Sequence, residues 1–396
     1  MQGIDTLMRR HADDPAALGP ALGALFHEWD HAADAGYWEL PAGRHPAFQR
    51  HGIQELGFER SRREPEWSAA CRVAGRQAEV DLPSLNIGGW YDIFCQGTLE
   101  NFVESRAAGR PATLIMGPWA HTNSAGQIGD MNFGMAASAN LLGFRGPLAD
   151  VQTAWFRKWL TPDADAAPSG PELPPVLLFV MGKNEWREEQ EWPLARAVDK
   201  DLFLRADGAL AFELPQGDEG VDTYVYDPAD PVPTTGGATL MSSEYRPGPL
   251  DQTRVEARED VLVYTTEPLV EDLEVTGRVR AFLHAATDAP STDWVVRLCD
   301  VDPEGVSLNV VDGIVRMETT TAEFAEHAVD LWSTSYVFRA GHRLRVHVTS
   351  SSFPRWDRNL NTGEPVDSGT DFRPARQQIA HDAARPSRLV LPVVGS

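Results

Sequence analysis

The chain has 396 residues, of which 42% are hydrophobic and 23% are charged, a composition typical of a globular protein large enough for two or three domains. Its formal net charge of -23 disfavours nucleic acid and anionic membranes as partners, because either polyanion would be repelled. No apolar run approaches the roughly eighteen residues of a membrane span. From the charge and from this pattern together, we expect neither nucleic acid nor membrane as a partner.

The three cysteines, Cys71, Cys95 and Cys299, are far apart in the sequence. They form neither a disulfide framework nor the close spacing of a metal knuckle, which favours a reducing compartment. The first ten residues also lack the apolar segment of a signal peptide. We therefore expect a cytoplasmic protein with no metal or other cofactor.

Residues 1 to about 75 are polar and helix-biased, with no apolar core of their own. The character changes near Asp81, where a short apolar run reads as a strand that ends at Gly88 and Gly89. A helix is predicted from about Gly97 to Ala107, and a second strand from Ala112 to Met116. Strand, helix and strand in this order predict a βαβ unit.

Another amphipathic helix is predicted over Val151–Leu160, and residues 161–175, rich in Pro, Ala, Asp and Gly, read as a linker. Beyond the linker, short β-type runs alternate with turn residues. This pattern indicates an antiparallel sandwich or jelly roll. The predicted strands are Val176–Met181, Leu202–Leu204, Thr223–Tyr226, Val261–Tyr264, Val275–His284, Asp293–Cys299, Tyr336–Phe338, Leu344–Ser350 and Leu389–Val394.

Asp92 and His121 follow the two strands of the predicted βαβ unit. Both strands are parallel, so the loops after them emerge at the same sheet edge. A carboxylate there can accept the Nδ1 proton of an imidazole and stabilise the imidazolium during general-base catalysis. Asp and His residues are common in the loops of α/β proteins. The spacing alone therefore leaves open a purely structural role for Asp92 and His121.

Longer stretches around this pair resemble one family, the CocE/NonD hydrolases, which are the cocaine esterases and X-prolyl dipeptidyl peptidases. The resemblance rests on Gly88-Gly89-Trp90-Tyr91-Asp92-Ile93-Phe94, Gly97-Thr98-Leu99, Gly117-Pro118-Trp119-Ala120-His121, Phe179-Val180-Met181-Gly182 with Trp186 and Trp192, Tyr226-Asp227-Pro228-Ala229-Asp230-Pro231-Val232-Pro233, Ser350-Ser351-Ser352-Phe353-Pro354-Arg355 through Asn361-Thr362-Gly363, and Arg385-Pro386-Ser387 with Leu389-Val390-Leu391-Pro392. It covers roughly residues 80 to 396.

The resemblance implies a fold of the class α/β plus all-β. Residues 1–78 would be the remnant of a helical cap, and residues 79–165 the C-terminal part of an α/β-hydrolase domain. Residues 166–396 would form a jelly-roll β-sandwich similar to the C-terminal domain of X-Pro dipeptidyl peptidases.

The resemblance also implies that Asp92 is the acid and His121 the general base of a Ser-His-Asp triad. It places Phe94 near the acyl pocket and makes Trp90, Tyr91 and Trp119 candidate walls of a substrate site. Packing at the domain interface suits these three aromatic side chains equally. The implied substrates are small-molecule acyl esters, amides or X-Pro peptides.

The serine of this family lies in a G-x-S-x-G elbow upstream of the acid, and the sequence contains no such motif. Gly305-Val306-Ser307-Leu308-Asn309 lacks the second glycine, and Ser124 has no strand before it that would make an elbow. We therefore expect the chain to be a truncated or split form, inactive alone. A sheet without its upstream strands should expose an edge. We therefore expect the chain either to form homo-oligomers or to bind a complementing N-terminal half.

Two other functions fit parts of the sequence. His27, Glu28 and His31 match H-E-x-x-H, the pattern of a zinc-dependent hydrolase, with Glu39 or Glu55 as a third ligand. Chance polarity on a solvated helix explains the same residues. Alternatively, the β-rich half could act as a non-catalytic binding module.

Overall fold

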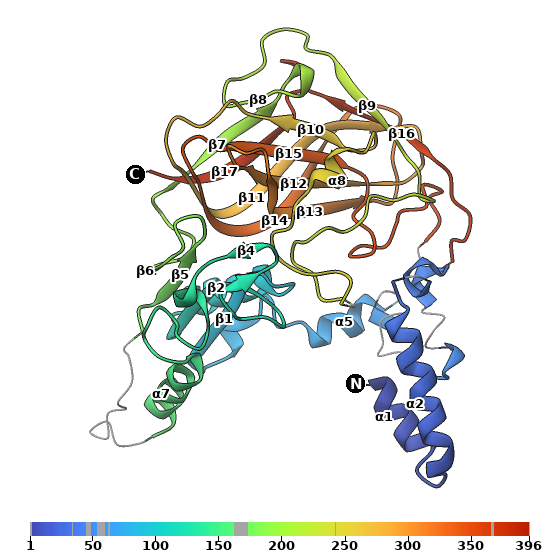
Figure 1. Cartoon of the computed structure of the whole chain (residues 1–396), viewed down its shortest axis with the longest axis vertical. Coiled ribbons are helices and arrows are strands. Elements are labelled where there is room, and N and C mark those ends of the chain that lie inside the picture. Colours follow the sequence, from blue (N-terminus) through green and yellow to red (C-terminus); the bar gives the residue numbers. More distant parts are fainter. Residues whose placement is uncertain are drawn as a thin grey trace.

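The computed structural model describes residues 2–33, 35–44, 49–53, 60–61, 64–161, 173–241, 243–365 and 368–395. An N-terminal helical arm, a small α/β sheet and a large β-sandwich follow one another along the chain (Figure 1). Within these residues no helix combines the length and apolar character needed to cross a membrane. Residues 162–172 of the predicted linker lie outside the described residues.

The N-terminal arm consists of short helices, as the polar sequence predicted. These are α1 (Gln2–Arg10), α2 (Pro15–Asp30) and α5 (Pro65–Cys71). No residue of α2 is buried, and Figure 1 shows α1 and α2 extending side by side away from the sandwich. The arm contacts the sandwich at Trp38, whose ring centroid lies 4.6 Å from that of Phe353 and whose carbonyl oxygen accepts from Arg358.

The predicted βαβ unit is confirmed. It consists of β1 (Ser84–Tyr91), α6 (Cys95–Ala107) and β2 (Ala112–Ala120), and β1 pairs with β2 in parallel. The strand β1 runs through Gly88 and Gly89 and does not end there. The reason is a close approach: a Cβ on Gly89 would lie 2.2 Å from the carbonyl oxygen of Trp119. Gly89 therefore permits strand contact and does not break the strand.

Two strands that follow the predicted domain boundary at residue 166 join the α/β sheet. β5 (Val176–Val180) pairs in parallel with β2, and β6 (Glu185–Glu189) pairs antiparallel with β5, which gives the sheet order β1-β2-β5-β6. Every residue of β5 is buried. A short apolar run of this kind suits a parallel sheet and a sandwich core equally, so the sequence does not distinguish them.

Helices cover both faces of this sheet. Leu99 and Phe102 of α6 are buried on one face, and Val151 of α7 (Leu148–Leu160) packs on the other. A short hairpin of β3 (Gln127–Ile128) and β4 (Met131–Asn132) lies between β2 and α7 in the chain. Among the described residues no strand pairs with the outer edge of β1, and Leu82 just before it is 67% exposed. The open edge expected from the sequence is therefore present.

The sandwich has two sheets. The order in the first is β10-β15-β12-β13, and in the second β8-β7-β17-β11-β16-β9, with β14 paired to β11. The strands are β7 (Ala197–Leu204), β8 (Leu210–Ala211), β9 (Val221–Tyr226), β10 (Leu262–Thr265), β11 (Leu273–Thr287), β12 (Thr292–Val301), β13 (Ser307–Met317), β14 (Ala325–Phe338), β15 (Arg343–Thr349), β16 (Ala375–Ala380) and β17 (Arg388–Val394), with a short helix α8 (Thr253–Glu256).

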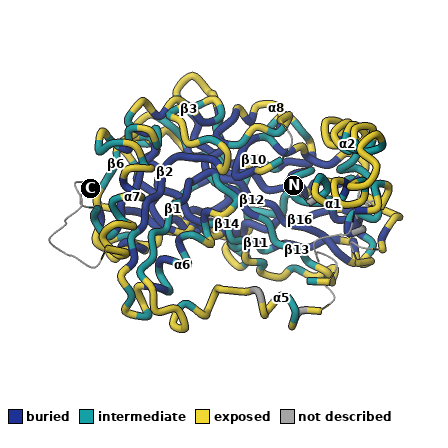
Figure 2. The backbone as a smooth tube through the Cα atoms, turned by 90° about the horizontal axis from the view of Figure 1, so that it is seen from below, coloured by how far each residue is buried: buried dark blue, intermediate teal, exposed yellow. Residues whose placement is uncertain are grey.

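One buried apolar cluster continues from the α/β sheet into the sandwich. It includes Leu114 and Phe179 of the sheet and Val275 and Phe338 of the sandwich, and Figure 2 shows dark, buried backbone running across both parts. The hydroxyl group of Tyr91, at the end of β1, also donates a hydrogen bond to the carbonyl oxygen of Asn309 in β13 at 3.4 Å. The sandwich therefore forms part of the support beneath the ends of β1 and β2.

Candidate active site

Asp92 and His121 lie at the same edge of the sheet, each directly after its strand. Tyr91, the last residue of β1, pairs with Ala120, the last residue of β2, so the two following residues are brought together. His121 Nδ1 lies 3.2 Å from Asp92 Oδ1 and 3.3 Å from Asp92 Oδ2. The structure therefore joins the two side chains that the sequence analysis paired.

The Asp92 carboxylate is held in place from its own loop. Its Oδ1 accepts a hydrogen bond from the main-chain N–H of Phe94 at 2.9 Å, and its main-chain N–H donates to Gly89 at 3.1 Å. The Asp92 side chain is only 16% exposed, whereas that of His121 is 38% exposed. A fixed carboxylate behind a more exposed imidazole is the arrangement in which the acid orients the base.

The two ring nitrogens of His121 have different surroundings. His121 Nε2 makes no hydrogen bond with any residue that the structure describes, while Nδ1 faces Asp92. With the proton on Nδ1 donated to the carboxylate, Nε2 is the atom that can accept a proton. This pair can supply the base of an acyl-transfer reaction but not its nucleophile.

Phe94 lies against the imidazole. The ring centroids of Phe94 and His121 are 5.1 Å apart in an edge-to-face arrangement, and Phe94 is 56% exposed. An aromatic ring left open to solvent beside a general base offers an apolar surface for a substrate group.

The three other aromatic candidates are buried. Trp90, Tyr91 and Trp119 are each at most 4% exposed. Trp90 donates to the Phe179 carbonyl oxygen, and Trp119 Nε1 donates to that of Ala137 at 2.7 Å. In this structure their side chains pack between elements, the alternative role that the sequence left open.

Neither serine considered from the sequence is hydrogen-bonded to the His121 imidazole. Ser307 is fully buried in the sandwich strand β13, and exposed Ser124 makes no hydrogen bond with His121. Across the described ranges no hydroxyl group is hydrogen-bonded to the His121 ring.

The H-E-x-x-H residues lie at the C-terminal end of α2, where Glu28 is held by other partners. Arg50 Nε donates to Glu28 Oε1 at 2.6 Å, and His51 Nε2 contacts the other oxygen. His31 Nδ1 lies 2.8 Å from the carbonyl oxygen of His27. A glutamate in these ion pairs is not placed to activate a metal-bound water.

Neither residue suggested as a third zinc ligand is shown beside this motif as a ligand. Glu39 forms an ion pair with Arg50 at 2.8 Å, and Glu55 lies outside the described residues. No cluster of three His, Cys, Asp or Glu side chains in the part of the chain that the structure describes is placed to hold a metal ion.

Two protein-family models match the chain. The model of the X-Pro dipeptidyl-peptidase C-terminal non-catalytic domain matches residues 171–390, and that of the X-Pro dipeptidyl-peptidase S15 family matches residues 27–123. The second match includes both Asp92 and His121. The first begins before β5, so this family domain includes the two strands that join the α/β sheet.

Individual relatives are esterases and peptidases. The chain is 39% identical to the cocaine esterase of Rhodococcus sp. (strain MB1 Bresler) over 343 residues, which are 81% of this chain and 58% of the relative. It superposes on an aminopeptidase from a marine sediment Thaumarchaeota archaeon with a TM-score of 0.78 and 27% identity, covering 89% of this chain and 62% of the other. It superposes on an α-amino acid ester hydrolase with a TM-score of 0.73 and 27% identity, covering 90% of this chain and 64% of the other.

A CocE/NonD family hydrolase from Staphylococcus aureus shares the fold alone, with a TM-score of 0.59 and 14% identity. The chain spans less than two thirds of the length of each of these relatives. The C-terminal domain model nevertheless covers more than half of the chain. The chain therefore belongs to the CocE/NonD hydrolases, the serine-hydrolase family of cocaine esterase and the X-Pro dipeptidyl peptidases.

Proposed function

We propose that Asp92 and His121 are the acid and general base of a Ser-His-Asp triad that hydrolyses acyl esters, amides or X-Pro peptide bonds. The observation that supports this most strongly is the contact of His121 Nδ1 with both carboxylate oxygens of Asp92. Asp92 would fix the tautomer that leaves Nε2 free to take the serine proton. It would then stabilise the imidazolium that forms.

The serine would come from a polypeptide segment outside these 396 residues, since the sequence contains no G-x-S-x-G. The outer edge of β1 supports this proposal, because its backbone groups can pair with a further parallel strand. Such a segment would also bring the oxyanion-hole donors, which together with the nucleophile supply the largest catalytic effects. By itself the chain should show negligible turnover.

Esters of hydrophobic acids are the substrates that we favour within this family. The ring of Phe94 lies beside the base and is open to solvent, which suits an apolar acyl group. The 39% identity to a cocaine esterase supports an ester substrate as well. In this proposal Trp90, Tyr91 and Trp119 would shape the substrate site only from behind, since all three are buried.

The test is complementation. The chain is co-expressed with the upstream half of a full-length relative that carries a strand, G-x-S-x-G and a helix, and the purified complex is assayed with a p-nitrophenyl butyrate ester and an X-Pro p-nitroanilide. We expect ester hydrolysis that requires both polypeptides and the added serine.

Two controls make the result decisive. Replacing the supplied serine by alanine, or His121 by alanine, should each lower kcat by about a thousandfold or more. A fluorophosphonate probe applied to the chain alone should label no serine. Labelling of the lone chain, or full activity of the His121→Ala complex, would show that the proposal is wrong.

A further inference from the structure

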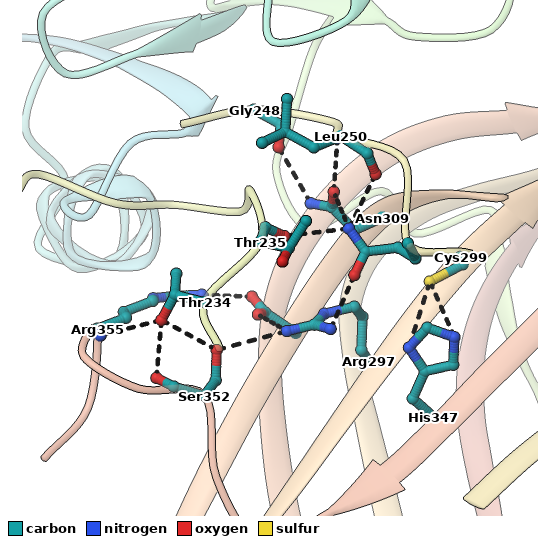
Figure 3. A network of polar contacts seen from close by, with 12 residues as sticks. Thr234, Thr235, Gly248, Leu250, Arg297, Cys299, Asn309, His347, Ser352 and Arg355 are labelled. Atoms are coloured by element: carbon teal, nitrogen blue, oxygen red, sulfur yellow. Dashed lines mark hydrogen bonds and ion pairs between the residues drawn. The ribbon is translucent and has the colours of Figure 1, made fainter. Parts of the chain in front are cut away.

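A groove lies on the surface of the sandwich. Inside the sandwich, polar groups bond to one another, as Figure 3 shows for Thr234, Ser352 and Arg355. The groove instead is open to solvent, between the β7–β8 hairpin and residues 266–273, and its volume is about 810 Å³. This volume is within the range of about 300–1,000 Å³ that is usual for ligand sites.

The floor of the groove is apolar and reaches the core. Leu210, a member of the main buried cluster, is 3% exposed, and Phe203 is 7% exposed. Leu269 and Leu273 pack against the same cluster, whereas Val270 at the rim is 96% exposed. Apolar side chains of a partner can therefore be buried here.

One wall of the groove is an open strand edge. β7 pairs with β17 along nearly its whole length, but with β8 only at its last two residues. The main-chain N–H of Leu204 donates to Ser387, so the alternation of an antiparallel pair turns the main-chain groups of Asp199 and Asp201 away from β17. Pro392, which has no N–H, stands opposite Asp199, in agreement with this alternation. Among the described residues no strand pairs with the outer side of these two aspartates.

The opposite wall of the groove is held in place. The main-chain N–H of Leu269 donates to the carbonyl oxygen of His342, and the carbonyl oxygen of Leu269 accepts from Gly341, both at 2.8 Å. A wall that is already fixed loses little conformational entropy when a partner binds.

The rim of the groove is acidic. Four carboxylates and one ammonium group line it, those of Asp201, Glu213, Glu267, Glu271 and Lys200. Two of the carboxylates lie within 4 Å of arginine side chains. Glu213 and Glu271 are exposed and form no ion pair with any residue that the structure describes. The rim therefore favours a cationic partner, and the net charge of -23 disfavours a second copy of this chain.

We propose that this groove binds an extended peptide segment in which basic side chains alternate with apolar ones. The segment adds to the sheet as a strand that pairs with the main-chain groups of Asp199 and Asp201. Successive side chains of a strand point to opposite sides, so the apolar ones pack on the floor while the basic ones lie towards Glu213 and Glu271. The site is independent of the triad proposed above.

The test uses the purified chain and a fluorescein-labelled hexapeptide, Lys-Val-Lys-Val-Lys-Val-amide, in fluorescence anisotropy. We expect saturable binding, and the same peptide with glutamate in place of lysine should bind at least about tenfold more weakly. Binding of the lysine peptide should also weaken as sodium chloride is added, because the charges of the rim are exposed.

Two N-methylated peptides test the strand pairing. One carries methyl groups on the main-chain nitrogens of its lysines, and the other carries them on those of its valines. Only one of these sets faces β7 in an added strand. The peptide that loses these donors should bind about tenfold more weakly, whereas the other should keep the affinity of the parent.

Charge reversal in the chain tests the place of binding. Glu213→Lys combined with Glu271→Lys should weaken binding of the lysine peptide at least about tenfold. Glu304→Lys combined with Glu318→Lys changes the net charge equally at exposed carboxylates outside the groove and should keep the affinity within about threefold. All four positions are exposed, and equal unfolding midpoints verify that both double variants fold.

Equal affinities for the lysine and glutamate peptides would overturn the proposal, as would equal losses in the two double variants. Unweakened binding of both N-methylated peptides would exclude an added strand and would also overturn it. Displacement of the peptide by an equal concentration of phenethylamine would identify a site for small hydrophobic cations instead of a peptide.

Discussion

Gly89 lies so close to Trp119 that no side chain at position 89 would fit between them. A Cβ at Gly89 would lie 2.2 Å from the Trp119 carbonyl oxygen and 2.9 Å from its Cβ. The contact crosses the β1–β2 pair three residues before Asp92 and two residues before His121. The spacing of the acid and base therefore depends on a glycine that takes no part in the chemistry.

Gly89→Ala should lower the free energy of unfolding by about 2 kcal/mol or more, because neither backbone can move without breaking the strand pair. Urea unfolding of the purified chain measures this. Gly97→Ala is the matched control: Gly97 is exposed within α6 and an added Cβ meets nothing within 4 Å. That change should be neutral or stabilising by up to about 1 kcal/mol.

Asp92→Asn in the complemented enzyme should lower kcat by about 10³ to 10⁴, because an amide can donate to the imidazole and stabilise the wrong tautomer. Initial rates of ester hydrolysis measure the effect. Asp81→Asn, at an exposed carboxylate that pairs with Arg110, should leave the rate unchanged. Comparable losses in both variants would argue against a catalytic role for Asp92.

Glu256 should make the protein sensitive to acid. Burial opposes its ionisation, but the contact with His347 and the charge of Arg345 outweigh burial and lower its pKa to about 2. The folded-state pKa is below the unfolded value of about 4.5, so this stabilisation is complete above that pH. This stabilisation is lost as the pH falls from about 4.5 towards 2. The total loss in the free energy of unfolding is on the order of 3 kcal/mol.

His347 should add to this acid sensitivity. Burial lowers its pKa from the ordinary value, so the unfolded state takes up a proton before the folded state does. Stability is therefore also lost as the pH falls below about 6.5. The unfolding midpoint is measured between pH 3 and 7 at intervals of about one pH unit. It should decline less steeply with falling pH for Glu256→Gln than for the unmodified chain. Parallel curves would contradict this assignment.

An ion pair connects the α/β sheet to the sandwich. Arg187 of β6 donates to both oxygens of Glu274 of β11, at 2.9 and 2.7 Å, and both side chains are largely buried. Arg187→Met should destabilise the chain by about 3 kcal/mol, because Glu274 would remain buried without its partner. Arg280→Gln, which removes an exposed pair with Asp199, should cost less than about 1 kcal/mol. Chemical denaturation compares the two variants.

The open edge of β1 should cause self-association. Leu82 is exposed beside that edge, and a lysine there would oppose strand pairing between two chains. Sedimentation velocity should show oligomers of the unmodified chain and a shift towards monomer for Leu82→Lys. Leu214→Lys, at an exposed leucine of the sandwich, should leave the distribution unchanged. A stable monomer of the unmodified chain would contradict the prediction.

Several features needed the assembled structure. The sequence predicted that β5 lies in the sandwich, whereas it pairs with β2. Trp90 and Trp119 were candidate substrate walls, yet their indole nitrogens are satisfied by main-chain oxygens that lie 89 and 18 residues away along the chain. The ion pair of Arg187 with Glu274 carries no spacing signal at all, because the two residues are 87 positions apart. In each case the deciding contact joins residues remote in sequence.

What the sequence determined by itself was the local part of the site. Hydrophobic periodicity and turn residues define β1, α6 and β2, and a parallel pair necessarily brings Asp92 and His121 to one edge. Only the tertiary structure decided which aromatic side chains are buried and which charged groups pair with one another. Local patterns report backbone conformation, whereas burial and charge pairing arise from contacts between segments far apart in the chain.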